Sequence, residues 1–106
     1  MKEILTPTVT EHLKLLDRAF ENSTRLGIMS ALMVADSVSY TELKNLLKVS
    51  DGNIAGHIKI LEREEYISVI KQFIDRKPNT SYSVTEKGRT AFLRHLDALE
   101  AILKQR

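Results

Sequence analysis

The 106-residue sequence contains no cysteine, no tryptophan and only two prolines. Without cysteine, disulfide bonds, thiolate metal ligands and a cysteine nucleophile are all excluded. The chain also lacks a long uncharged apolar run, and its first residues, MKEILTPTVTEH, lack the apolar centre of a secretory signal. We therefore expect no membrane-spanning segment and no export, and we place the chain in the cytoplasm.

The sequence signatures of catalysis are missing as well. There is no Gly-rich phosphate-binding loop, and the three histidines, His12, His57 and His95, are scattered along the chain. His57 lies within an amphipathic segment and is expected to have a structural role. A metal site that combines His12 and His95 from two copies has no support in the pattern. We expect no enzymatic activity, no metal and no cofactor.

The composition indicates one small globular domain spanning residues 1–106, because 42% of its residues are hydrophobic. A net charge of +2 and an isoelectric point near 9.0 are only mildly basic. Attraction to nucleic acid must therefore come from local clusters of Lys and Arg.

Apolar residues at helical spacing mark the two ends of the chain. A first helix is predicted over residues 8–21, and a last helix over residues 85–105. A second, more uniformly apolar helix over residues 23–35 is expected at the centre of the domain. Each terminal helix carries a stripe at steps of four, three and four residues: Val9, Leu13, Leu16 and Phe20 in the first, and Phe92, Leu96, Leu99 and Leu103 in the last.

Two short helices separated by a tight turn are predicted in the middle of the chain. Ser39 and Glu42 have the spacing of a capping box, which starts a helix that continues to about Lys48. The Ser50–Gly52 cluster supplies a turn and a new cap. A helix over residues 51–65 follows, whose buried face is formed by Ile54, Ile58 and Leu61. This arrangement is a helix-turn-helix.

After this pair, the hydrophobic period changes from that of a helix to that of a strand. YISVIKQF, residues 66–73, is rich in β-branched and aromatic residues, and TSYSV, residues 80–84, reads as its return strand. Asp75 to Asn79 form the predicted connection, with Pro78 in the loop or at a strand edge. The fold class is therefore mostly α with a small β-hairpin, an α+β arrangement.

DGNIAGHIKILEREEYI and FIDRKPNTSYSVTEKGR, with the element order around them, carry a resemblance to a known family. The sequence resembles the winged-helix DNA-binding domains of MarR/ArsR-like transcriptional regulators over residues 22–92, about two thirds of the chain. The features in common are the Gly-Asn at the start of helix 51–65, the Leu-Glu near its end and the Thr-Glu-Lys-Gly after the hairpin. The resemblance implies a recognition helix at residues 51–65 and a basic wing at residues 71–81.

Candidate DNA contacts follow from this arrangement. The recognition helix would enter the major groove, and the wing would reach the backbone or the minor groove. The predicted DNA-binding residues are Thr41, Asn53, Ala55, Gly56, Lys59, Lys71, Arg76, Lys77 and Thr80. Ala55 and Gly56 allow close approach to DNA but offer no hydrogen bonds to base edges. Alternatives are that Thr41 only caps its helix, that Asn53 supports the turn and that Lys59 is a solvated charge.

The terminal stripes predict a two-fold dimer, because neither is needed to complete the core of a winged helix. The alternative is that both stripes pack on their own domain. Two function classes remain: a dimeric regulator that binds double-stranded DNA, and a winged-helix module that binds protein. The sequence leaves open whether a small-molecule effector is sensed, and which one.

Overall fold

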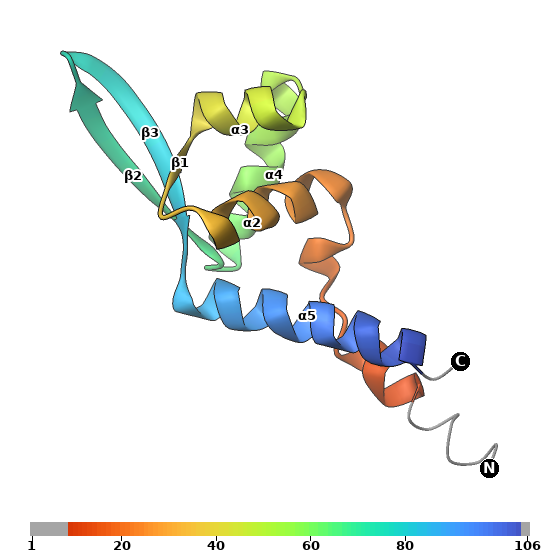
Figure 1. Cartoon of the computed structure of the whole chain (residues 1–106). Helices are drawn as coiled ribbons and strands as arrows, with labels where there is room; N and C mark the ends of the chain where they lie inside the picture. Colours follow the sequence, from red (N-terminus) through yellow and green to blue (C-terminus); the bar gives the residue numbers. More distant parts are fainter. Residues whose placement is uncertain (1–8, 105–106) are drawn as a thin grey trace, which may run out of the picture.

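A computed structural model gives the fold and describes residues 9–104 (Figure 1). A helical segment at residues 9–14 comes first. It is followed, in order, by η1 (Arg18–Phe20), α2 (Ser23–Val34), β1 (Val38–Ser39), α3 (Tyr40–Leu47), α4 (Asp51–Arg63), β2 (Ile67–Ile74), β3 (Lys77–Val84) and α5 (Glu86–Lys104). The predicted outer ends of the terminal helices, residues 8 and 105, lie outside the described residues. The α+β winged-helix fold is confirmed.

The helix-turn-helix is formed by α3 and α4, as predicted. Ser39 Oγ accepts a hydrogen bond from the Glu42 amide at 3.1 Å, and Glu42 Oε1 accepts one from the Ser39 amide at 3.0 Å, which completes the capping box. Lys48 then ends α3 in a left-handed conformation. Ser50 caps α4 by accepting from the Asn53 amide at 3.3 Å. These local hydrogen bonds set the start of both helices.

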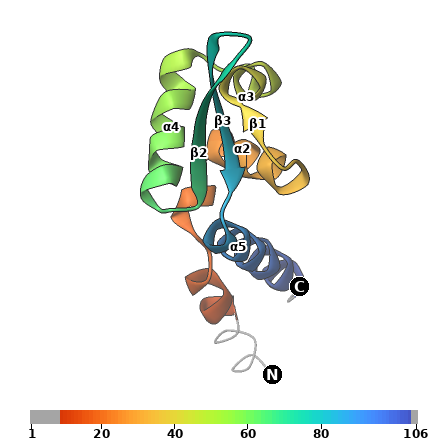
Figure 2. The ribbon, with the colours of Figure 1, turned by 90° about the vertical axis from the view of Figure 1, so that its left-hand side faces the viewer.

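Helix α2 occupies the centre of the core, also as predicted. It contacts η1, α3, α4 and β3. Its Ile28, Met29 and Leu32 are fully buried. They pack with apolar side chains from α3, α4 and the base of the hairpin, namely Leu43, Ile54, Ile58, Leu61, Ile67 and Tyr82. Figure 2 shows α4 on one side of the hairpin, with α3 and β1 on the other.

The hairpin connection is shorter than predicted. Residues 75–79 were expected to form it, but β3 begins at Lys77, so Asp75 and Arg76 alone make the turn. Both have positive φ, 51° and 67°, which a two-residue turn of type I′ requires. Pro78 fits inside β3 because it pairs with Phe73, next to the closing Ile74–Lys77 pair. At such a position the backbone nitrogen points away from the partner strand, so no ladder hydrogen bond is lost.

The sheet has a third strand that the sequence did not predict. In the order β1–β3–β2, the two residues of β1 pair antiparallel with β3, Val38 with Tyr82 and Ser39 with Ser81. Because α3 begins at the next residue, this pairing holds the N-terminus of α3 beside the hairpin.

The prediction of a continuous helix over residues 8–21 is wrong, because the backbone is extended at Asp17. The Asp17 amide donates to His95 Nδ1 at 2.9 Å. Its Oδ1 accepts from the Ala19 amide at 2.9 Å, and its Oδ2 accepts from the Tyr66 hydroxyl. Burial of Tyr66, together with this carboxylate, raises the pKa of the phenol, which stays protonated as the donor. Three hydrogen bonds at one residue replace the helical ones.

Phe20 and Phe92 lie in the core of their own chain, which corrects their predicted place on an exposed stripe. They are 2% and 4% exposed, and their ring centroids are 5.1 Å apart in an edge-to-face contact. Phe20 also stacks on Tyr66 at 5.2 Å. These contacts fasten the start of α5 to the domain, so neither side chain faces outward.

The start of α5 is fitted closely against the turn before β2. Thr85 Oγ1 accepts from the Gly88 amide at 2.9 Å and donates to the Glu65 carbonyl at 2.7 Å. The Thr85 amide donates to the Tyr66 carbonyl at 3.0 Å. A Cβ atom at Gly88 would lie 2.1 Å from that same carbonyl oxygen. The Thr-Glu-Lys-Gly sequence therefore joins the hairpin to α5, and only glycine fits at its last position.

Candidate nucleic-acid interface

The predicted DNA-binding residues come from three elements at the end of the molecule away from α5 (Figure 1). These elements are the N-terminus of α3, the outer face of α4 and the wing, residues 71–81. The hairpin projects beyond the core because only the first residue of β2 is buried, while the rest of that strand is exposed. The arrangement presents two helices and a projecting hairpin on one side.

A hollow of about 470 Å³ joins α3 to the wing. It brings together three of the predicted residues, Thr41 from the start of α3, and Lys71 and Thr80 from paired positions of β2 and β3. The remaining lining residues are Ser39, Tyr40, Pro78, Asn79 and Tyr82. A helix N-terminus, a lysine and the hydroxyl groups of two threonines around one hollow are suited to an anion such as phosphate.

The outer face of α4 carries the next group of predicted residues. Asn53, Gly56 and Lys59 are exposed, whereas Ala55 is half-buried. Asn53 Oδ1 accepts a weak hydrogen bond of 3.4 Å from Thr24 Oγ1, so this side chain also has a local contact. A Cβ atom at Gly56 would meet no atom within 4 Å. The glycine is therefore not required by packing within the chain.

The N-terminus of α4 carries an acidic residue whose charge is paired. Lys44 Nζ lies 3.1 Å from Asp51 Oδ1, and the Tyr40 hydroxyl donates to the same oxygen at 3.2 Å. The hydrogen bond and charge of Lys44 lower the pKa of the Asp51 carboxyl. Burial and the Asp51 carboxylate raise the pKa of Tyr40. The lysine thus offsets the repulsion that Asp51 would exert on a phosphate.

Tyr40 and Lys44 were not among the site residues predicted from the sequence. They lie one turn apart on α3, and this spacing is the signal that both side chains face α4. Their shared partner, Asp51, becomes apparent only from the fold.

Polar contacts of Arg25 join α4 to α2. Arg25 Nη1 lies 2.9 Å from His57 Nδ1, and Arg25 Nε donates to the Ala19 carbonyl at 2.6 Å. Burial of His57 and the nearby Arg25 charge lower the pKa of the imidazole. A neutral ring can accept the hydrogen bond from the guanidinium. The structural role expected for His57 is confirmed, and Arg25 is a partner that the sequence did not indicate.

The wing carries exposed cations and an exposed aromatic side chain. Lys71, Arg76 and Lys77 are all exposed, with Asp75 as the only acidic residue of the tip. Phe73 is 75% exposed. The cationic side chains predicted at the tip are therefore exposed, and beside them lies an exposed phenylalanine, Phe73, which was predicted only as part of a strand.

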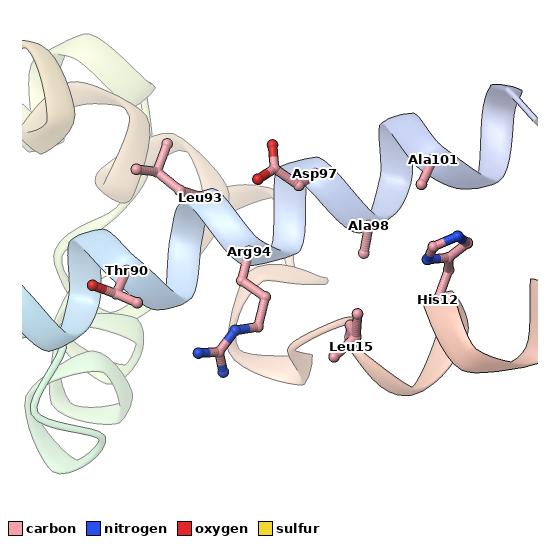
Figure 3. Close-up of a pocket in the computed structure, with 8 residues that line it drawn as sticks. All are labelled: His12, Leu15, Thr90, Leu93, Arg94, Asp97, Ala98 and Ala101. Carbon is pink, nitrogen blue, oxygen red and sulfur yellow. The ribbon is translucent and has the colours of Figure 1, made fainter. Parts of the chain in front are cut away.

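A hollow of about 580 Å³ lies at the opposite end, between α5 and the N-terminal segment. Figure 3 shows the Ala98 and Arg94 side chains pointing from α5 towards the segment that carries Leu15 and His12. The rest of the lining is Thr90, Leu93, Asp97 and Ala101. Two of the lining residues, Leu15 and Leu93, are large exposed apolar side chains, and Leu13, Leu96, Leu99 and Leu103 are also exposed on the same two segments.

Over residues 9–104, no group of three or more His, Cys, Asp or Glu side chains is arranged to hold a metal ion. Among the described helices, none combines the length and the apolar character needed to cross a membrane.

Comparison with known proteins identifies similar chains. Residues 24–103 match a family model described as a winged helix DNA-binding domain. The uncharacterised protein MJ0432 of Methanocaldococcus jannaschii is 29% identical over 79 residues, which cover 74% of this chain and 86% of that protein.

Solved structures of regulators have the same fold. A transcriptional regulator homologue from Pyrococcus horikoshii OT3 superposes with a TM-score of 0.80 at 28% identity, covering 92% of this chain and 95% of the other. A mutant of MarR from E. coli superposes with a TM-score of 0.69 at 14% identity, covering 99% and 79%. The structural neighbours are regulators of the MarR and ArsR type.

Proposed function

Because the chain belongs to the family of winged helix DNA-binding domains, we propose that it is a transcriptional regulator that binds duplex DNA as a homodimer. In this proposal α4 enters the major groove, and the wing contacts the backbone or the minor groove. The observation that carries it is the hollow where Thr41, Lys71 and Thr80 meet. Residues 39 apart in the sequence converge there on a site suited to a backbone phosphate.

The conformation of the wing tip supports a contact made by Arg76. A type I′ turn favours Asn-Gly or Asp-Gly, since both central residues need positive φ. Here the second position is Arg76 at φ 67°, where a glycine would be less strained. Because Arg76 has an unfavourable backbone conformation at an exposed tip, we infer that its side chain is needed for contact with a partner.

The outer face of α4 favours close approach of its backbone to DNA over hydrogen bonds between its side chains and base edges. Gly56 is exposed, with open space where a side chain would stand. A bare backbone can come near the groove wall, but it leaves only a few polar side chains on that face, namely Asn53, Lys59 and Arg63, and the two basic ones suit phosphates. We infer that sequence preference depends mainly on DNA shape and on the wing.

The second surface supports pairing of two copies through α5 and the N-terminal segment. Leu96, Leu99 and Leu103 remain exposed on α5, and Leu13 remains exposed on the N-terminal segment. Several large apolar side chains exposed on two terminal segments are typical of an interface. Because Phe20 and Phe92 are buried, the proposed interface contains the remaining residues of the predicted stripes, Val9, Leu13, Leu16, Leu96, Leu99 and Leu103. Two recognition helices about 34 Å apart would then fit a palindromic site.

A charge placed within this surface is expected to separate the copies. Leu99 is 41% exposed on α5, so Leu99→Glu should leave the fold intact and yield a monomer of 12.1 kDa at tens of micromolar in sedimentation velocity, where the wild type sediments as a dimer. The matched control is Val34→Glu, because Val34 is 88% exposed at the end of α2 and should not affect assembly. Equal sedimentation of wild type and Leu99→Glu would argue against this interface.

The DNA-binding proposal is tested by fluorescence anisotropy with a mixed-sequence duplex at several salt concentrations. Counterion release predicts that the logarithm of the affinity falls linearly with the logarithm of salt, with a slope of about 0.9 for each phosphate contact. A winged-helix module that binds protein through an apolar surface shows no such dependence. Absence of wild-type binding even at low salt would reject the DNA reading and favour the protein-binding alternative.

A further inference from the structure

Phe73 is the most exposed aromatic ring among the three phenylalanines. It is 75% exposed, whereas Phe20 and Phe92 are buried in the core. Its strand, β2, also exposes Val69, Ile70 and Ile74. Single apolar side chains on a surface need no explanation, but an aromatic side chain near the end of a projecting hairpin lies where a partner is met first.

The strand register shows which way Phe73 faces. Side chains two apart on a strand share a face, so Phe73 lies on the same face as Lys71. Their partners on β3 are Pro78 for Phe73 and Thr80 for Lys71. Lys71, Pro78 and Thr80 line the hollow against α3. Phe73 therefore belongs to the face of the wing that is directed to the helix-turn-helix, one step nearer the tip.

The charges around Phe73 restrict the chemistry of its partner. Lys71 precedes it on the same face, and Arg76 and Lys77 follow at the turn, with Asp75 as the one acidic neighbour in the tip. A matching partner is anionic at its rim and apolar or aromatic inside. The minor groove has this form, because phosphates border a floor of sugars and stacked bases, and apolar side chains are known to insert there as wedges.

We propose that Phe73 inserts into the minor groove as a wedge that partly unstacks a base step, while Arg76 and Lys77 hold the adjacent phosphates. This rests on the proposed function, because it requires that the wing meets DNA on the face shared by Lys71 and Thr80. The wedge makes the wing a device that bends DNA, and it favours sequences with flexible pyrimidine–purine steps.

The experiment uses the full chain and a short duplex that carries a donor dye at one end and an acceptor dye at the other. Wild type should raise energy transfer on binding, because wedge insertion bends the duplex. Phe73→Ala should bind about tenfold more weakly for each wing that contacts the duplex, which corresponds to about 1.4 kcal/mol per wing, in the range of one lost aromatic–base contact. When this variant binds, energy transfer should change little from that of the free duplex. The slope of log affinity against log salt should stay as in the wild type, because no charge is altered. Phe73→Leu should retain part of the bend.

The matched control is Ile74→Ala, because Ile74 is 49% exposed at the neighbouring position and points to the opposite face. It should bind and bend like wild type. Binding without bending by wild type, unchanged bending by Phe73→Ala, or an equal loss in Ile74→Ala would each overturn the wedge while salt-dependent binding still upheld the proposed function. Absence of wild-type binding at low salt would overturn both.

Discussion

Replacing Gly88 with alanine is expected to cost about 3 kcal/mol of folding stability, near the upper end of what overpacking usually costs. The added Cβ would lie 2.1 Å from the carbonyl oxygen of Tyr66 and 2.8 Å from its carbonyl carbon and Cα. These are backbone atoms, so no side-chain rotation relieves the overlap. That carbonyl also accepts from the Thr85 amide, and any shift of α5 disturbs the Thr85 bonds to Gly88 and Glu65.

Urea or thermal unfolding followed by circular dichroism measures this effect, and a loss of 3 kcal/mol should lower the melting temperature by more than about 10 °C. Gly56→Ala is the matched control, because Gly56 is also helical but has open space around the added atom. It should increase stability by up to about 1 kcal/mol, the difference in helix propensity between the two residues. A Gly88→Ala protein as stable as Gly56→Ala would refute the close contact between α5 and the turn.

The double substitution Arg76→Ala, Lys77→Ala is expected to lower affinity for duplex DNA about a hundredfold at low salt, where charge-assisted contacts to phosphate contribute most. The slope of log affinity against log salt should become shallower by about 1.8 for each protomer, since two phosphate contacts are lost. Both side chains are exposed at the turn, so the fold should be unaffected.

Anisotropy titrations at several salt concentrations measure both quantities. Lys87→Ala, Lys104→Ala serves as the control, because it removes the same charge from α5. These two lysines form exposed pairs with Glu65 at 3.4 Å and Glu100 at 3.1 Å, and Lys87 also lies 5.9 Å from the centre of the Tyr66 ring; exposed contacts of these kinds contribute little to stability. If the control weakened binding as much as the wing variant, the effect would come from net charge, and the wing would have no special role.

Features encoded by neighbouring residues were predictable from the sequence. The capping box of Ser39 and Glu42 and the cap at Ser50 act over three residues, and the structure contains both where they were expected. The length of α5 likewise follows its apolar period, since Glu86–Lys104 lies within the predicted 85–105.

Features that depend on distant partners were missed. Asp17 interrupts the first helix because it bonds to Tyr66 and His95, which are 49 and 78 residues away. Strand β1 has two residues and exists only because β3 pairs with it. The tight turn at Asp75 and Arg76 lacks the glycine that usually marks a type I′ turn, so the prediction made the loop too long.

The candidate site was predictable in part for the same reason. The residue types of the wing and the start of α3 indicated Thr41, Lys71 and Thr80 one at a time, but only the fold brings them to one hollow. The Tyr40, Lys44 and Asp51 group joins two helices and required the turn geometry. Phe73 was not predicted as a site residue, because an aromatic residue in a strand usually belongs to a core.

Only the base of the hairpin is packed against the domain, so the outer part of the hairpin has more conformational freedom than the base. Tyr66, Ile67 and Tyr82 are buried, whereas positions 68–78 are exposed to solvent on both strands. The outer ladder can therefore open and close at a small local free energy without disturbing α2 or α4. A partner that binds the tip must supply the free energy to order it, so part of the gross contact energy does not appear as affinity. In return, a partner that binds the tip need not match one fixed conformation of it.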